Sequence, residues 1–201
     1  MQSNWFLSDT TENLARALLG KVLTVDGIGG YIVETEAYLG QVDEAAHVFG
    51  DKLTPRTRAL YADPGTIYVY QMRQYSLLNV STQAKGTPQG ILIRAIEPAF
   101  GIATMQERRQ QPVTNLTNGP GKLAQALAIT VADTGGMINQ DRIQIHETGA
   151  KKVAKIMTSP RIGVPNKGEW TEAPLRYYVA GNPDVSAIKK QTITTTRGWL
   201  T

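Results

Sequence analysis

The chain has 201 residues, no cysteine, a net charge of +4 and 41% hydrophobic residues. This composition excludes disulfides and thiolate metal sites, and it predicts one folded domain over residues 1–201. No apolar run approaches the roughly 20 residues that a membrane helix needs, and the N-terminus lacks the pattern of a secretory signal. We therefore expect a cytoplasmic protein.

The first expected elements are a helix and a hairpin. After three candidate caps, Ser8, Asp9 and Thr10, apolar residues recur at helical spacing, and a strand over residues 21–25 follows. Gly27, Gly29 and Gly30 are predicted to form the turn into the next strand.

The remainder of the chain alternates strands and turns with two further helices. The elements expected are strands over 30–40, 66–70, 90–98 and 176–181, a long polar loop over 40–63, and helices over 98–110 and 120–129. Hairpins dominate over regular βαβ units. We therefore predict an α+β fold, a single domain with a largely antiparallel curved sheet flanked by helices.

Charge is concentrated in two segments. Residues 34–44 hold four acidic and no basic side chains, whereas residues 151–161 hold four basic and no acidic ones. One interpretation pairs a polyanion-binding surface with carboxylate chemistry, and the other treats both segments as solvated faces.

The expected strand at 30–40 carries two carboxylates. Alternation places Ile32, Glu34, Glu36 and Tyr38 on one face. The structural interpretation is an exposed face with ordinary salt bridges. The functional interpretation is a general base or nucleophile, and two acids would also suit a sugar glycosidase.

Aromatic and basic residues suggest contacts with nucleic acid. Tyr68 and Tyr70 share a strand face and serve either as core residues or as a stacking platform, to which Tyr38 and His47 could contribute. Lys122 follows Gly119-Pro120-Gly121, which lacks the full spacing of a nucleotide-binding loop but suits a single phosphate at a helix start. The two histidines lack metal-ligand spacing, so we expect no metal.

Seven motifs in order resemble the alkyladenine, or 3-methyladenine, DNA glycosylase family. They are VETEAYLG (33–40), DEAAH (43–47), TPRTR (54–58), PGTIYVY (64–70), ILIRAIEP (91–98), NGPGKLAQALAI (118–129) and the run RIG, GEW and PLRYYV within 161–179. The resemblance covers nearly the whole chain.

The resemblance implies an activity and its partner. It implies a monofunctional glycosylase that flips alkylated or deaminated purines out of damaged double-stranded DNA and releases them by hydrolysis, leaving an abasic site for base excision repair. Expected substrates are 3-methyladenine, 7-methylguanine and hypoxanthine. No cofactor, metal or membrane is implied, and we expect a monomer.

The resemblance also implies the catalytic residues. Glu36 matches the general base that activates a water for attack on C1′. Arg94 matches a residue that helps to hold this water, and Val164 matches one whose backbone carbonyl does likewise.

The base-binding residues follow from the same resemblance. Tyr38, His47 and Tyr70 match the walls that sandwich the flipped base, and Asn79 matches a side chain that crowds the 2-amino group of normal guanine.

Four residues are expected at the DNA. Arg56 and Lys122 match positions near the DNA backbone. The family usually places a tyrosine in a short turn after the TIYVY strand, where it wedges into the duplex, but this chain has Gln71-Met72-Arg73-Gln74-Tyr75. Met72 or Arg73 is expected in that role.

Two other functions remain open from the sequence. A nucleic-acid-binding module without catalysis would account for the altered turn and for Pro165, where the family usually has glycine. A carbohydrate hydrolase would use Glu34 and Glu36 but would leave the basic segment without a purpose.

Overall fold

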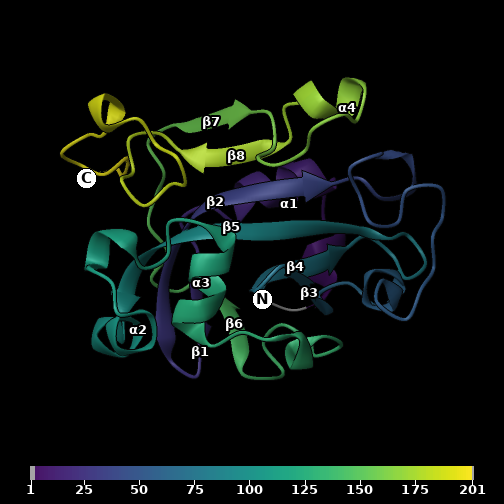
Figure 1. The fold of residues 1–201 in the computed structure, drawn as a ribbon, viewed down its shortest axis with the longest axis horizontal. Helices are drawn as coiled ribbons and strands as arrows, with labels where there is room; N and C mark the ends of the chain where they lie inside the picture. Colours follow the sequence, from purple (N-terminus) through teal and green to yellow (C-terminus); the bar gives the residue numbers. More distant parts are fainter. Residues whose placement is uncertain (1–2, 201) are drawn as a thin grey trace.

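The computed structural model describes residues 3–200, and an antiparallel sheet organises them (Figure 1). The strand order is β3-β4-β5-β2-β1-β6, while β8 pairs with β2 and β7 pairs with β8. The strands are β1 (Val22–Val25), β2 (Ile28–Tyr38), β3 (Ile67–Met72), β4 (Tyr75–Thr82), β5 (Gln89–Phe100), β6 (Ile143–His146), β7 (Ile156–Ser159) and β8 (Arg176–Val179).

Short helices flank this sheet, which confirms the predicted α+β class. The α-helices are α1 (Thr11–Ala17), α2 (Ile102–Arg109), α3 (Pro120–Leu127) and α4 (Glu169–Glu172), and 3₁₀ turns lie at Ser3–Leu7, Gly40–Val42, Arg58–Tyr61, Val113–Asn115, Val131–Asp133 and Lys190–Thr192. Of the three candidate caps, Thr10 is the one that caps α1, and its side chain accepts from the amide of Asn13. Within residues 3–200, no helix is both long and apolar enough to cross a membrane.

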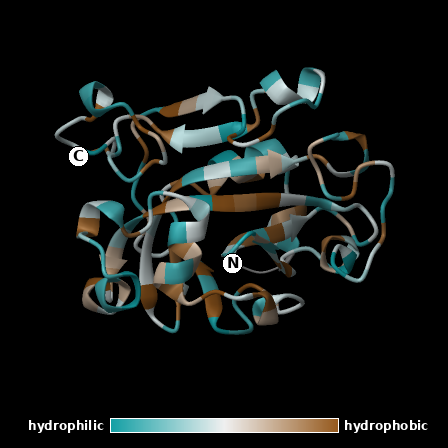
Figure 2. Ribbon diagram, in the orientation of Figure 1, coloured by the Kyte–Doolittle hydropathy of each residue, from teal (hydrophilic) through white to brown (hydrophobic). Residues whose placement is uncertain are grey.

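The core lies between the sheet and its helices. Figure 1 shows α3 in front of the sheet and α1 behind it, and Figure 2 shows hydrophobic residues along much of β5. Leu14 and Leu18 bury the apolar side of α1 and its last turn, and Leu123 and Leu127 do the same for α3. Each fully buried leucine contributes roughly 1.5–3 kcal/mol. The amphipathic spacing of these leucines therefore decides which side of each helix meets the sheet.

The first hairpin differs from its prediction in the place of its turn. Asp26 and Gly27 form the turn, with φ angles of 51° and 78°. Gly29 and Gly30 lie inside β2, where a Cβ would stand 1.9 Å from the carbonyl oxygens of Leu23 and Glu97 respectively. These glycines are needed because neighbouring backbones approach too closely for a side chain.

Strand β4 is absent from the sequence prediction. It pairs with β3 through a two-residue turn at Arg73 and Gln74, and with β5 on its other side. The turn contains no glycine, and Arg73 itself takes the positive φ of 56°. The usual sequence signal of a hairpin, a glycine in the turn, is therefore missing.

Candidate active site

A cavity of about 620 Å³ opens beside β2, β4 and β5 and is closed by three further segments: the loop at 45–48, the start of α3 and residues 162–164. Nine of the eleven predicted site residues line it: Tyr38, His47, Arg56, Tyr70, Met72, Asn79, Arg94, Lys122 and Val164. The other two differ in position. Glu36 is fully buried, and Arg73 is exposed at the hairpin turn.

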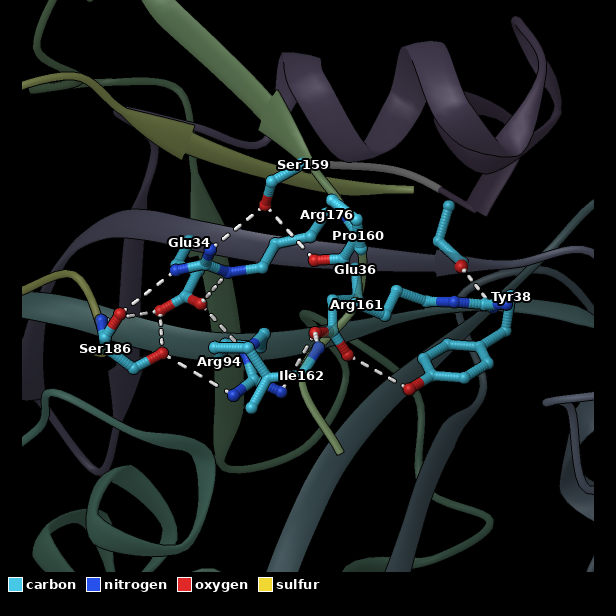
Figure 3. Close-up of polar contacts among 11 residues, drawn as sticks. Glu34, Glu36, Tyr38, Arg94, Ser159, Pro160, Arg161, Ile162, Arg176 and Ser186 are labelled. Atoms are coloured by element: carbon cyan, nitrogen blue, oxygen red, sulfur yellow. Dashed lines mark hydrogen bonds and ion pairs between the residues drawn. The ribbon is translucent and has the colours of Figure 1, made fainter. Parts of the chain in front are cut away.

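Glu36 lies directly behind the wall of this cavity. Its Oε1 forms an ion pair with Nη1 of Arg94 at 3.1 Å and accepts from the amide of Ile162 at 2.8 Å. Its Oε2 accepts from the hydroxyl of Tyr38 at 3.0 Å. All three partners line the cavity. Figure 3 shows these contacts of Glu36. They hold the carboxylate at the edge of the space that a substrate would enter.

Glu34, its neighbour on the strand, is occupied on both oxygens. Oε1 accepts from Nε of Arg94 at 2.9 Å and from Nε of Arg176 at 2.6 Å. Oε2 accepts from the amide of Ser186 at 2.8 Å and from its hydroxyl. A carboxylate has about four acceptor sites, so Glu34 is saturated. Among the described residues, only one donor reaches Oε2 of Glu36. Glu36 therefore keeps room for a water.

Two irregularities in the β2–β5 ladder aim Arg94 at both carboxylates. The ladder pairs Ile32 with Ile96 but Glu34 with Ala95, which leaves Val33 as an extra residue on β2. It then pairs Thr35 with Ile93, which leaves Arg94 as an extra residue on β5. Such bulges re-aim side chains and are common beside active sites. Here the bulge releases Arg94 from the regular alternation.

The environments of the two carboxylates move their pKa values apart. Burial raises the pKa of Glu36 above its usual value, although Arg94 and the amide of Ile162 oppose the change. Burial also acts to raise the pKa of Glu34, but the guanidinium groups of Arg94 and Arg176 outweigh it and lower that pKa. Glu34 thus stays ionised as a structural anion, while Glu36 is tuned toward proton exchange.

Aromatic rings form one wall of the cavity. The rings of His47 and Tyr70 meet edge to face with centroids 4.5 Å apart, and Tyr68 stacks on Tyr70 at 5.8 Å. Nδ1 of His47 lies 2.8 Å from the hydroxyl of Tyr68, to which Nε of Arg56 donates at 3.3 Å. Arg56 can only donate, so the hydroxyl of Tyr68 accepts from it and also contacts the imidazole of His47.

The charge state of His47 follows from its surroundings. Burial lowers its pKa to about 4, and the positive charge of Arg56 contributes in the same direction. The ring is therefore neutral near pH 7. Asn79 is 5% exposed, and its amide donates to the carbonyls of Tyr68 and Leu77 at 3.2 Å each. Both side chains are thus fixed before any ligand enters.

The β3–β4 hairpin overhangs the cavity and rests on α3. Met72 is 53% exposed at the end of the hairpin and also lines the cavity. Tyr75, its ladder partner, packs so closely on Gly121 that a Cβ there would lie 2.7 Å from the ring. The glycine beside Lys122 is therefore explained by packing against Tyr75.

Lys122 keeps its charge available at the rim. Its Nζ donates to the side-chain oxygens of Asn115 at 2.7 Å and Asn118 at 2.9 Å. Both partners are neutral amides, so they orient the ammonium group without cancelling its charge. Burial lowers the pKa of Lys122, and nearby Arg109 adds to this effect.

The interpretation of the two charged segments as solvated faces was wrong for most of the acidic segment and holds for only half of the basic segment. Glu34, Glu36 and Asp43 are fully buried, and Arg161 is bidentate on Asp43. Lys151 pairs with Glu97 at 2.7 Å. The other members, Glu44, Lys152 and Lys155, are exposed. Two of the four basic side chains, Lys151 and Arg161, are thus paired with acids of the fold, so they do not contribute to a polyanion-binding surface.

The structure adds residues that the sequence reasoning missed. Ile162, two residues before Val164, supplies the amide that contacts Glu36, whereas Val164 lies on the cavity wall. Pro165 is exposed and is not among the lining residues. Backbone donors leave no mark in a sequence, so only the fold could identify Ile162. Within residues 3–200, no three histidine, aspartate or glutamate side chains gather as a metal site.

Comparison with known proteins gives a consistent result. The sequence model of the family described as Methylpurine-DNA glycosylase matches residues 5–183. A protein of Lactiplantibacillus plantarum is 48% identical over 98% of this chain and 97% of its own length. One from Enterococcus faecalis is 50% identical over 94% of this chain and 85% of its own. A third, from Staphylococcus carnosus, is 47% identical over 92% of each. All three carry the name "Putative 3-methyladenine DNA glycosylase".

Proposed function

The chain belongs to the methylpurine-DNA glycosylase family, and we propose that it flips damaged purines out of duplex DNA into the 620 Å³ cavity and hydrolyses their bond to the sugar. The observation that carries this proposal is the pair of unequal carboxylates. Glu34 is saturated and ionised, while Glu36 has an acceptor site left at the cavity edge.

Glu36 acts as the general base in the proposed reaction. A water bound at Oε2 of Glu36 attacks C1′ of the flipped nucleotide, the C1′–N9 bond breaks, and its electron pair leaves with the purine. The water proton passes to Glu36. Arg94 holds the carboxylate through the 3.1 Å contact, and the carbonyl of Val164 is the further candidate for orienting the water. The products are the free base and an abasic site for base excision repair.

The cavity suits purines that leave easily. Alkylation at N3 of adenine or N7 of guanine makes the base cationic, so it departs as a neutral molecule. A cationic base is also attracted to the faces of Tyr38 and Tyr70. Hypoxanthine is neutral, so it departs as an anion that takes up a proton from solvent, and its release depends more on positioning. Neutral His47, which contacts Tyr70 on the same wall, adds no like charge that would repel a cationic base. We therefore propose 3-methyladenine, 7-methylguanine and hypoxanthine as substrates.

The neighbouring surface provides the proposed DNA contacts. Met72, the exposed apolar side chain of the hairpin, enters the gap that the flipped nucleotide leaves. Arg73 at the turn, Arg56 and Lys122 at the rim bind phosphates. Asn79, held by two carbonyls, excludes the 2-amino group of normal guanine from the pocket.

A lesion panel tests this function. Purified protein is incubated with duplexes that contain 3-methyladenine, 7-methylguanine or hypoxanthine, and released base is measured. We expect release from at least the cationic lesions, and Glu36→Gln should reduce the rate by about 10²–10⁴-fold. The matched control, Glu172→Gln, changes an exposed carboxylate of α4 and should leave the rate unchanged.

Other outcomes identify the alternatives. Salt-dependent DNA binding without release of any base would show a binding module and overturn the proposal. A full rate in Glu36→Gln would overturn the assigned base. The carbohydrate alternative needs two available carboxylates, and the saturation of Glu34 argues against it.

A further inference from the structure

We propose that Glu34, clamped by Arg176 and Ser186, is a positioning residue that aims Arg94 at Glu36 and balances the charge around it. This inference rests on the proposed function, because it concerns how the general base is prepared. It gives a purpose to a fully buried acid that touches no part of the cavity.

The geometry joins the two carboxylates through one rigid group. Arg94 donates from Nε to Glu34 at 2.9 Å and places Nη1 3.1 Å from Glu36 (Figure 3). A guanidinium is planar, so a fixed Nε also fixes the direction of Nη1. Because Arg94 is the extra residue of a bulge, the ladder alone does not determine where its side chain points. Glu34 supplies the missing constraint.

Glu34 is in turn held by the C-terminal part of the chain. Arg176, on β8, reaches Oε1 at 2.6 Å, and it also donates to Oγ of Ser159 and to the carbonyl of Ser186, both at 3.0 Å. The amide of Ser186 reaches Oε2 at 2.8 Å. The pairing of β8 with β2 therefore fixes the position of Glu34, which in turn fixes the guanidinium of Arg94 beside the carboxylate of Glu36.

Glu34 and Glu36 face the guanidinium groups of Arg94 and Arg176, and all four side chains are buried or nearly so. The two negative and two positive charges of this cluster cancel. In such surroundings one uncompensated charge strongly changes the proton affinity of its neighbours. The titratable groups around Glu36 are Glu34 and Tyr38 on β2, Tyr70 on β3, Arg94 on β5, Arg161 after β7 and Arg176 on β8.

Substitutions that remove opposite charges next to Glu36 should shift its pKa in opposite directions. In Glu34→Gln the amide oxygen can still accept from Nε of Arg94, but a negative neighbour of Glu36 is lost. The pKa of Glu36 therefore falls, and the acid limb of the excision rate moves to lower pH. In Arg176→Met a positive neighbour is lost, so that pKa rises and the limb moves to higher pH. We expect shifts of about one pH unit or more. The double variant should return close to the wild-type limb.

The experiment measures single-turnover release of a lesion base from pH 4 to pH 9. Both single variants should also lower the plateau rate by about 10–100-fold, while the Kd for lesion DNA stays within about twofold of wild type. Matched controls are Glu147→Gln, an exposed partner of Lys21, and Arg142→Met, which pairs with Asp26 and Asp133. Neither control should move the acid limb.

Two further measurements test the role of Glu34 if the wild type is inactive or if a charge variant does not fold. If the wild type releases no base, the proposed function fails. The positioning inference is then tested by ¹³C NMR titration of the glutamate carboxyl carbons, in which the signal that disappears in Glu36→Gln is assigned to Glu36. If a charge variant does not fold, Ser186→Ala keeps every charge and should slow release several-fold without weakening DNA binding. Shifts of Glu36 in the same direction in both single variants, or no shift in either, would overturn the inference.

Discussion

Arg161 and Asp43 form a fully buried, bidentate ion pair, with N–O distances of 2.5 and 2.9 Å. The guanidinium also covers Tyr38 at 4.6 Å from the ring centroid and donates to the carbonyl of Ala37 at 3.1 Å. The next residue, Ile162, donates its amide to Glu36. One ion pair thus supports both the ring of Tyr38 and the backbone donor of the site.

Removal of the Asp43 carboxylate should therefore lower the free energy of unfolding. In Asp43→Ala the charge of Arg161 stays buried without its partner, and we expect the free energy of unfolding to fall by about 3–5 kcal/mol. Urea denaturation followed by circular dichroism measures the change. The control Asp63→Ala removes an exposed partner of Lys85 and should cost less than about 1 kcal/mol. Equal losses in the two variants would show that the buried pair has no special role.

The hydroxyl of Tyr38 should assist the base separately from its ring. Tyr38→Phe keeps the aromatic wall but removes the 3.0 Å hydrogen bond to Oε2 of Glu36. Without this donor the pKa of Glu36 rises, so the acid limb of base release should move to higher pH. We expect a rate about 3–10-fold lower at pH 7 with unchanged DNA affinity. In contrast, Tyr38→Ala should also weaken the binding of lesion DNA. A wild-type rate and acid limb in Tyr38→Phe would contradict this role.

The contact between Tyr75 and Gly121 should couple the hairpin to α3. An added methyl at Gly121 would stand 2.7 Å from the ring of Tyr75, so Gly121→Ala must displace the hairpin that carries Met72. We expect a loss of about 1–3 kcal/mol in unfolding free energy together with slower release of base. The double variant with Tyr75→Ala removes the clash, and its loss should be smaller than the sum of the single losses. Additive losses would show that the two residues act independently.

His47 should make the stability of the fold depend on pH. Unfolded, its imidazole takes up a proton near pH 6.5, whereas the folded group does so only near pH 4. Between these values the unfolded state binds more protons, so stability falls as the pH decreases from about 6.5 to about 4. We expect about 1–2 kcal/mol from this group, because its partial exposure reduces the effect of the shift.

Unfolding in urea at pH 7 and pH 5 measures this contribution. The substitution His47→Gln removes the titrating group, so the variant should lose less stability over this interval than the wild type. His146→Gln, which changes the other histidine of the chain on β6, is the matched control for the loss of an imidazole. An unchanged pH dependence in His47→Gln would contradict the prediction.

The parts of the fold that the sequence predicted correctly are those with local signals. The leucine spacing of α1 and the apolar run of β5 each specify an element through its own period. Strand β4 was missed because its entry turn, at Arg73 and Gln74, holds no glycine. The turn prediction at Gly29 and Gly30 was wrong. These two residues are glycines because the backbones of Leu23 and Glu97 approach them too closely for a side chain.

The chain by itself determined the family, the α+β class and the residues that gather around the cavity, because ordered motifs and periodicity are properties of the sequence. Only the tertiary structure decided what distinguishes Glu36 from Glu34. The donors that saturate Glu34 come from Arg94, Arg176 and Ser186, which lie 60 to 152 positions away along the chain. Two bulges, which the alternation of side chains does not reveal, turn Arg94 toward both acids. Long-range pairing and register therefore distinguish the proposed general base from its neighbour on the strand.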